Sequence, residues 1–214
     1  MSKVYFVSGI NTDAGKTYVT GYIARRLMEQ GKRVITQKFI QTGNEEWSED
    51  IEVHRRIMGT GMLPEDIDHT TAPIIFSYPA SAQLAARIDG REINLEVIDR
   101  ATERLASLYD IVFVEGAGGL AVPITDTFMA IDYVATRHLP VILVTNGVLG
   151  SINHTVLSLE AIRSRGIELA AVLYNEHFDT DTTIAADTRG FIRRYVERNF
   201  PEAEFEIIPS VKAD

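Results

Sequence analysis

The chain of 214 residues contains no cysteine, which excludes disulfides, thiolate metal sites and cysteine nucleophiles. It also has no long basic tract, and its formal net charge of −9 argues against binding nucleic acid through phosphate neutralisation. Its longest apolar runs, such as 141–144, are the length of a strand and far shorter than the ~20 residues of a membrane helix. Together with the absence of a secretory pattern, these features predict a cytoplasmic protein that binds a small molecule, without a nucleic-acid or membrane partner.

Hydrophobic residues make up 45% of the chain, enough for the core of one domain spanning residues 1–214. Apolar runs typical of strands alternate with segments of helical periodicity, which predicts an α/β fold: a doubly wound, mostly parallel sheet with helices on both faces. The least regular region, 41–78, is rich in glycine and proline and is predicted to form a functional rim. The predicted strands lie at 4–8, 33–37, 110–114, 140–145, 168–174 and 204–208, and the predicted helices at 16–30, 80–89, 94–108, 127–137, 153–165 and 181–199.

A glycine-bounded loop follows the first predicted strand and leads directly into a helix. It runs from Gly9 to Gly15, and Lys16 and Thr17 open the helix. Backbone N–H groups in such a loop point at phosphates, the lysine adds a movable positive charge, and the threonine hydroxyl can bind Mg²⁺. Five residues separate the two glycines where the standard phosphate loop has four, but the working end is unchanged. The motif predicts a phosphate-loop NTPase fold that binds ATP or GTP.

A second candidate site begins at Glu115, which ends a buried strand and is followed by Gly116, Ala117 and Gly118. A carboxylate at the end of a strand next to the phosphate loop lies near the metal ion, so Glu115 is a candidate to hold Mg²⁺ directly or through water. The glycines allow the backbone to approach phosphate closely. The alternative is a strand-terminal glutamate before a flexible turn.

Lys38 follows the predicted strand 33–37 and is expected to point into the same cavity, where its charge can stabilise a transferring phosphoryl group. Taken alone, it is more typical of a solvated lysine. Asp50 is a further candidate metal ligand, although the acidic run 45–52 around it is typical of a solvated surface. His54 lies one helical turn beyond Asp50, but it is excluded as a ligand because Mg²⁺ prefers oxygen.

Asn175 ends another predicted strand, where its amide offers adenine both a donor and an acceptor; formation of a turn is an equally good interpretation. The turn 147–154 leads into a helix whose free N–H groups can receive a carboxylate, although Ser151 or Asn153 can equally cap that helix.

These motifs together resemble the dethiobiotin synthase family, whose members also have the lengthened phosphate loop. The family catalyses an ATP-dependent ring closure in biotin synthesis. The resemblance implies that 7,8-diaminononanoate takes up CO₂ as a carbamate, that ATP phosphorylates the carbamate, and that the second amine then displaces phosphate. It further implies a homodimer with its substrate site at the interface. The segments that carry the resemblance are 5–9, 15–17, 38, 42–43, 114–119, 140–144 and 150–154.

The resemblance also implies roles for individual residues. The implied catalytic residues are Lys16, Lys38 and Thr12, and the implied Mg²⁺ ligands are Thr17, Asp50 and Glu115. The implied ATP-binding residues are Asp13, Ala14, Gly15, Lys16, Thr17, Tyr18, Asp50, Glu115, Gly116, Ala117, Gly118, Asn175, Glu176 and Pro209. The implied substrate-binding residues are Thr12, Lys38, Thr42, Leu149, Gly150 and Asn153, with the 149–153 turn supplied by the partner subunit. Asp13 and Thr42 stand where glutamate and serine are familiar in the family, and 176–190 offers no assigned clamp for the substrate carboxylate.

Three alternative functions remain open at this point. A regulatory ATPase of the partitioning or septum-positioning kind has the same fold, but such proteins resemble one another in a lysine where this chain has Asn11. An amide ligase of the cobyrinate type also activates a carboxylate with ATP, yet without cysteine this chain would need a separate glutaminase. A non-catalytic nucleotide-binding module would keep Lys16 without needing Lys38.

Overall fold

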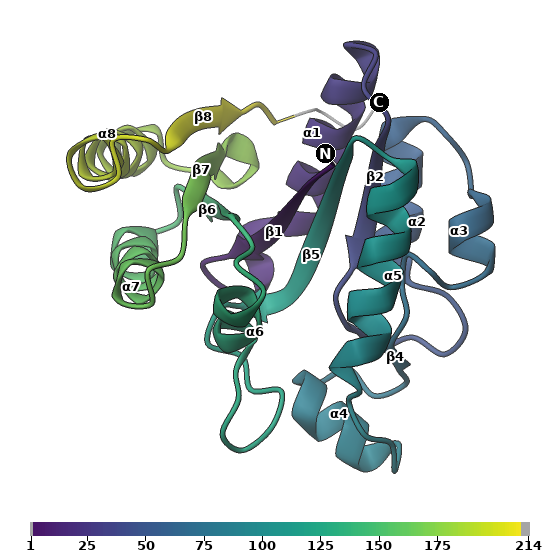
Figure 1. Ribbon diagram of the computed structural model, residues 1–214. Helices are drawn as coiled ribbons and strands as arrows, with labels where there is room; N and C mark the ends of the chain where they lie inside the picture. Colours follow the sequence, from purple (N-terminus) through teal and green to yellow (C-terminus); the bar gives the residue numbers. More distant parts are fainter. Residues whose placement is uncertain (1, 211–214) are drawn as a thin grey trace.

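The computed structural model describes residues 2–210, and its centre is a six-stranded sheet in which every neighbouring pair of strands is parallel. The strand order is β2-β5-β1-β6-β7-β8 (Figure 1). The strands are β1 (Lys3–Gly9), β2 (Val34–Lys38), β5 (Ile111–Gly119), β6 (Val141–Asn146), β7 (Leu169–Asn175) and β8 (Glu204–Ile208). Each corresponds to a predicted strand, because a parallel sheet covered on both faces needs continuous apolar runs.

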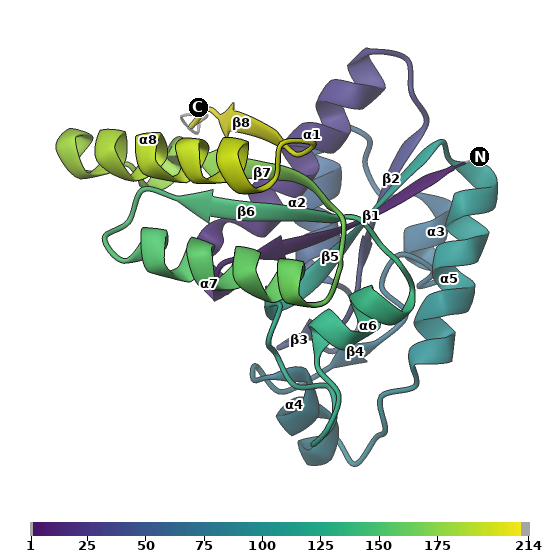
Figure 2. The ribbon, with the colours of Figure 1, turned by 60° about the vertical axis from the view of Figure 1, so that its left-hand side comes forward.

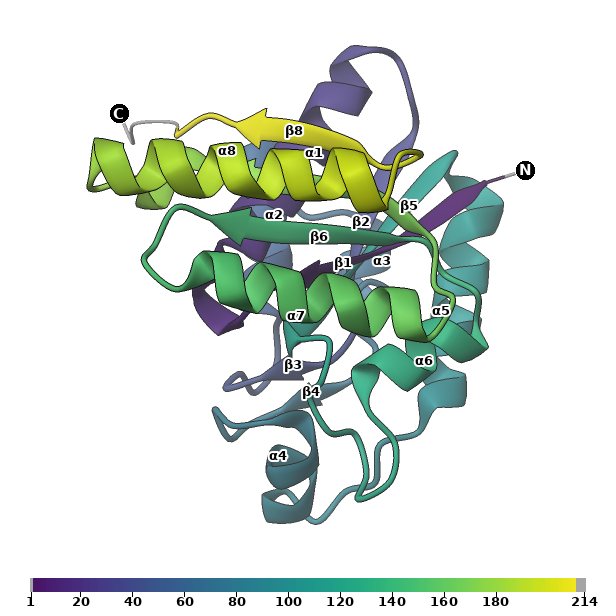
Figure 3. The ribbon, with the colours of Figure 1, turned by 90° about the vertical axis from the view of Figure 1, so that its left-hand side faces the viewer.

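Helices cover both faces of this sheet. Figure 1 shows α5 in front of β2 and α2 behind it, and Figure 3 shows α7 and α8 in front of the strands with α1 and α2 behind. The predicted doubly wound α/β fold is therefore confirmed. The longer helices are α1 (Lys16–Glu29), α2 (Glu49–Met58), α5 (Leu95–Leu108), α7 (Ser151–Ser164) and α8 (Thr182–Asn199); the shorter ones are α3 (Pro64–Ile67), α4 (Ala82–Ile88), α6 (Ala130–Thr136) and the 3₁₀ turns η1 (Thr12–Ala14) and η2 (Glu176–Phe178).

Local sequence explains where these elements begin and end. The apolar face of α1 buries Val19, Ile23 and Ala24, and the helix stops just before Gly31, whose φ of 82° favours glycine. All six residues of β6 are buried, as expected of a strand in the middle of a parallel sheet. No helix within residues 2–210 is long and apolar enough to cross a membrane.

The expectation that 41–78 is irregular is wrong, because this region contains α2, α3 and a small parallel sheet of β3 (Gln41–Thr42) and β4 (Ile75–Phe76). The helix α2 begins after Ser48, whose hydroxyl accepts a hydrogen bond from the N–H of Ile51. Its buried positions have helical spacing, but two of the four are polar, which hides the apolar period. They are Ile51, His54, Arg55 and Met58.

Further boundaries also differ from the prediction, and α6 begins at Ala130, three residues after the predicted start. The strand β5 continues to Gly119, although a turn is expected after Glu115, and Gly116 fits there because a Cβ would come within 2.9 Å of the Phe6 ring. The helix α7 begins at Ser151, two residues before the predicted start. At the bottom of Figure 2, α4 packs beside β3 and β4, away from the main sheet.

Candidate active site

The phosphate loop connects β1 to α1 through the single 3₁₀ turn η1, which lies within the lengthened loop. Gly15 closes the loop with a φ of 83°, and a Cβ on it would lie 2.2 Å from Nδ2 of Asn175. Both the backbone conformation and the space therefore require glycine at this position. The Lys16 ammonium folds back and donates to the carbonyl oxygens of Asn11 at 3.1 Å and Thr12 at 3.0 Å.

Burial removes water from the Lys16 ammonium and lowers its pKa to about 8, although the nearby Glu115 carboxylate acts in the opposite direction. Lys38 also lowers this pKa, so the two lysines lie close enough to repel each other. The inner end of the phosphate loop therefore holds two lysine ammonium groups beside the carboxylates of Glu115 and Asp50. The ammonium groups are suited to binding a highly charged anion.

Four side chains from four elements meet beside the loop. The Thr17 hydroxyl lies 3.0 Å from Asp50 Oδ1 and 3.0 Å from Glu115 Oε1. The Lys38 ammonium donates to the same Glu115 oxygen at 2.9 Å and also pairs with Asp50. Lys38 is only 5% exposed and Glu115 is fully buried. The structure thus brings together residues that the sequence places up to 98 positions apart.

The buried lysine and glutamate stabilise each other's charged forms. Burial would raise the pKa of Glu115, but Lys38 and His54 hold it well below its usual range. Burial would likewise lower the pKa of Lys38, but Glu115 and Asp50 raise it above its usual value. An ion pair this deeply buried contributes little net stability, so a functional reason for it is the better explanation.

His54 is the residue of this cluster that the sequence reasoning missed. Its Nε2 lies 2.7 Å from Glu115 Oε2, on the side away from Thr17 and Lys38, and its ring is fully buried. The spacing in the sequence indicated this role, because Asp50 and His54 are one helical turn apart and so lie on the same side of α2. His54 contacts Glu115, and Asp50 contacts Thr17 and Lys38, which are partners of Glu115. Excluding His54 as a direct metal ligand left no role for it.

Three groups with oxygen donors therefore lie together: the Thr17 hydroxyl and the carboxylates of Asp50 and Glu115. Hard oxygen donors of this kind fit Mg²⁺, which takes few protein ligands and completes its shell with phosphate and water. Within residues 2–210, no group of three or more histidine or acidic side chains is arranged to hold a metal ion. The donor set thus fits a metal ion that arrives with a nucleotide better than a permanently bound one.

A cavity of about 430 Å³ lies beside the phosphate loop. Its lining brings together Thr12 and Thr42, two of the predicted substrate-binding residues, with Ala117 and Gly118 of β5. The segment from Pro79 to Ala82, which carries the start of α4, completes the wall and was not assigned from sequence. The remaining lining residue is Val122.

The predicted substrate residues of the β6–α7 turn do not line this cavity in the single chain. Leu149, Gly150 and Asn153 are all exposed, and Leu149 is 81% exposed. The cavity and this turn are therefore separate surfaces of one subunit.

The residues predicted to bind the adenine of ATP lie at strand ends next to α1. Asn175 is buried, with its Nδ2 3.4 Å from the Ala14 carbonyl and its Oδ1 accepting from the His177 N–H. Tyr18 donates to the Pro209 carbonyl at 3.0 Å, which ties β8 to α1. Of the other predicted ATP-binding residues, Glu176 pairs with Arg189 of α8 and Asp13 is exposed on η1.

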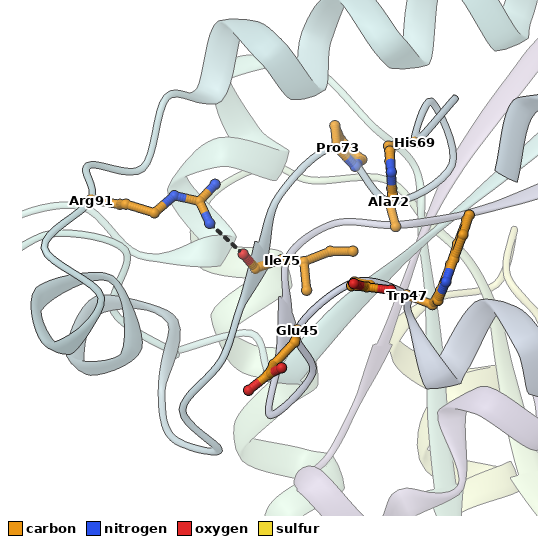
Figure 4. A pocket seen from close by; sticks show the side chains of 8 residues that line it. Glu45, Trp47, His69, Ala72, Pro73, Ile75 and Arg91 are labelled. Carbon is orange, nitrogen blue, oxygen red and sulfur yellow. Dashed lines mark hydrogen bonds between the residues drawn. The ribbon is translucent and has the colours of Figure 1, made fainter. Parts of the chain in front are cut away.

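A second cavity, of about 460 Å³, is lined by none of the predicted site residues (Figure 4). On one side, Arg91 donates to the Ile75 carbonyl at 2.7 Å. On the other, Trp47 stacks on His69 with their ring centroids 5.2 Å apart. The rest of the lining consists of Glu45, Glu46, Ala72 and Pro73. Because the phosphate loop lies elsewhere, this cavity is not the candidate active site.

Comparisons with known proteins show which family the chain belongs to. Residues 3–208 match a family model described as an AAA domain. The chain is 46% identical over 208 residues to "ATP-dependent dethiobiotin synthetase BioD 2" of Pasteurella multocida, an alignment that covers 97% of this chain and 98% of the relative. The chain belongs to the dethiobiotin synthetase family. A second family member, from Chlorobaculum tepidum, is 50% identical over 202 residues, which cover 94% of this chain and 84% of the relative. The predicted membership of this family of ATP-dependent ligases is confirmed.

Solved structures show how widely the fold of this dethiobiotin synthetase family member is shared. A ParA family ATPase from Chlorobium tepidum superimposes with a TM-score of 0.57 at 17% identity, covering 99% of this chain and 86% of that one. A ParA solved with nonspecific DNA gives a TM-score of 0.52 at 15% identity, covering 94% and 78%. At such low identity the likeness concerns the fold alone, so it does not favour a partitioning function.

Proposed function

We propose that this protein joins CO₂ to 7,8-diaminononanoate in an ATP- and Mg²⁺-dependent ring closure that yields dethiobiotin. The observation that carries the proposal is the contact of the buried Lys38 ammonium with Glu115, 2.9 Å away, beside the phosphate loop. A loop that only binds nucleotide has no need of this second buried cation. The names of relatives that match nearly the whole chain supply the product and the use of ATP. The diamine and CO₂ are the substrates that the family resemblance implies.

In the first step, one amine of the diamine attacks CO₂, forming a C–N bond and releasing a proton to give a carbamate. The cavity beside the phosphate loop has the chemistry for this step, since Thr12 and Thr42 both line it. Their hydroxyl groups can donate to the carbamate oxygens or accept from an amine, which fixes the orientation of the reacting end.

In the second step, a carbamate oxygen attacks the γ-phosphorus of ATP, and the bond to ADP breaks to give a carbamic-phosphoric anhydride. Negative charge then spreads over the carbamate and phosphoryl oxygens. The Lys16 and Lys38 ammonium groups, which lie close enough to repel each other, would stabilise this charge. Thr17, Asp50 and Glu115 would hold Mg²⁺, which when bound neutralises phosphate charge.

In the third step, the second amine attacks the carbonyl carbon of the anhydride. A second C–N bond closes the cyclic urea, the C–O bond breaks, and inorganic phosphate leaves while the amine loses its proton. Because both amines belong to one substrate, holding the diamine in a bent shape in the cavity supplies most of the acceleration for this step.

The site is proposed to be completed by a second copy of the chain. Support comes from the exposed β6–α7 turn, where Leu149 is 81% exposed and α7 begins after Gly150 without a side-chain cap. A helix N-terminus of this kind attracts a carboxylate, which is the chemistry of the far end of the substrate.

The deciding assay incubates the purified protein with ATP, Mg²⁺, bicarbonate and 7,8-diaminononanoate, and measures both the cyclic urea and ADP. We expect one ADP for each ring formed and no ADP production in the absence of the diamine. ATP hydrolysis without ring formation would contradict the proposal and favour a regulatory ATPase. ADP production that depends on ammonia and yields no cyclic urea would favour the amide ligase.

A further inference from the structure

The starting observation is that Glu115 is held on both of its carboxylate oxygens. Oε1 faces Thr17 and Lys38, at 3.0 Å and 2.9 Å, whereas the side chain that pairs with Oε2 within residues 2–210 is His54, at 2.7 Å. An ionised carboxylate can only accept hydrogen bonds, so Nε2 of His54 carries the hydrogen that is donated to Oε2.

The other ring nitrogen of His54, Nδ1, makes no hydrogen bond to the described residues 2–210, so the bond to Glu115 is the one that uses the polarity of the ring. The ring is fully buried. A buried nitrogen without a partner is costly, and an apolar side chain of similar size would avoid that cost. The bond to Glu115 is therefore the feature that a histidine contributes at this position.

The hydrogen bond from His54 to Glu115 matters most when Lys38 moves away from Glu115. In the mechanism proposed above, the Lys38 ammonium acts on the carbamate and phosphoryl oxygens, whereas here it lies against Glu115 and Asp50. When Lys38 turns toward the substrate, Glu115 loses one of its donors. The bond from His54 remains, because it uses the other oxygen and comes from a different element, α2.

We propose that His54 is a positioning residue that fixes the rotation of the Glu115 carboxylate, so that Oε1 is presented to Mg²⁺ beside Thr17 and Asp50. Groups that hydrogen-bond a metal-ligating carboxylate orient it and set its affinity for the metal. His54 itself does not touch the metal ion in this arrangement. The inference rests on the proposed function, because it takes Thr17, Asp50 and Glu115 as the metal ligands.

The test measures the affinity for Mn²⁺, as a spectroscopic substitute for Mg²⁺, by electron paramagnetic resonance in the presence of a non-hydrolysable ATP analogue. His54→Leu keeps an apolar side chain of similar size but removes the N–H. We expect it to raise the Kd for Mn²⁺ by about 10–100-fold, the usual cost of losing a group that orients a metal ligand. His54→Gln restores an N–H donor and is expected to recover most of the affinity.

Met58→Ala serves as the matched control, because it removes another buried side chain of α2, one turn beyond His54, whose sulfur contacts Arg55. It should lower the Tm while leaving the Kd for Mn²⁺ unchanged. The proposal is overturned if His54→Leu binds Mn²⁺ like the wild type, if Met58→Ala weakens binding equally, or if His54→Gln is as weak as His54→Leu.

The same samples separate this inference from the proposed function. If the wild type closes the ring and His54→Leu leaves the Kd for Mn²⁺ unchanged, only the role of His54 is wrong. If the wild type forms no ring but His54→Leu still weakens Mn²⁺ binding, the role of His54 stands and the proposed substrate is wrong.

Discussion

At the scale of single residues, Lys38 is a charged side chain that the fold holds almost completely out of water. Its ammonium is almost completely buried, and its neighbours Asp50 and Glu115 compensate its charge. Burying such a group costs several kcal/mol, which the ion pairs only roughly offset. An apolar side chain would cost less, so the charge is best explained by a reaction in which a triphosphate takes over the role of partner.

We predict that Lys38→Ala lowers kcat by about 10²–10³-fold, the usual cost of removing one group that stabilises transition-state charge. The affinity for ATP should change much less, because Lys38 acts on charge that develops during phosphoryl transfer. Steady-state kinetics and equilibrium binding of an ATP analogue measure the two quantities separately.

The control for this variant is Lys32→Ala, which removes the same charge from an exposed position after α1. Lys32→Ala should change neither kcat nor the affinity for ATP. Equal losses of turnover and nucleotide affinity in Lys38→Ala would make Lys38 a binding residue and contradict the proposed role.

Gly15 offers a second test at this scale, since Gly31 has nearly the same φ. Gly31→Ala should lower the free energy of unfolding by about 1–2 kcal/mol, the cost of the left-handed conformation for a residue with a Cβ. Gly15→Ala should lower it by more, because its Cβ would also lie 2.2 Å from Asn175 Nδ2. Only Gly15→Ala should also weaken nucleotide binding, because its Cβ would displace Asn175. At Gly31, by contrast, no atom of the described part of the chain, apart from the adjoining residues, lies within 4 Å of a Cβ. Denaturant unfolding and calorimetric titration would show this difference, and equal nucleotide affinities would refute it.

At the scale of elements, α2 positions two parts of the site and is itself anchored by a buried ion pair. Arg55 donates to both oxygens of Asp66 at 2.8 Å and to the Thr36 hydroxyl of β2 at 2.8 Å. These bonds fix the helix against the sheet, so Asp50 and His54 reach Glu115 from a rigid support.

We therefore predict that Asp66→Ala lowers the free energy of unfolding by about 3–5 kcal/mol, because it leaves the Arg55 guanidinium buried without its counter-charge. Arg104→Ala, which breaks the exposed pair with Asp68, should cost less than about 1 kcal/mol. Urea denaturation followed by circular dichroism measures both values. Similar losses for the two variants would mean that the buried pair does not anchor α2.

The same helix shows what the sequence could and could not predict. The six strands of the main sheet and α1 follow from apolar runs and periodicity, because their buried faces are hydrophobic. The helix α2 was missed because His54 and Arg55 occupy half of its buried positions. Their burial depends on partners from elsewhere in the chain, Glu115 and Asp66, and no local pattern contains that information.

At the scale of the whole molecule, strand order decides which motifs meet. The strand β5 lies between β2 and β1, so Glu115 is in register with Lys38 on one side and with Val7 on the other. The carboxyl ends of parallel strands share one edge of the sheet, which is why separate strand-end motifs could be expected to converge. The exact pairing of Lys38 with Glu115 could not be predicted from the sequence, because it depends on the strand order.

The last prediction concerns the assembly, in which the β6–α7 turn of one subunit would complete the site of another. Asn153→Asp places a negative charge in the first turn of α7, where the helix dipole favours it, so the fold should be preserved. The KM for the diamine should rise by about tenfold or more, because two like charges a few ångströms apart near a surface repel by more than about 1 kcal/mol.

Mixing subunits then tests whether the site is shared. Lys38→Ala and Asn153→Asp subunits, unfolded and refolded together, should recover about a quarter of the wild-type activity at low diamine concentration, because half of the dimers are mixed and each has one intact site. Each variant refolded alone is the control and should remain far less active. If Asn153 acted within its own subunit, every site in the mixture would carry one defect, and the activity would not exceed the average of the two variants.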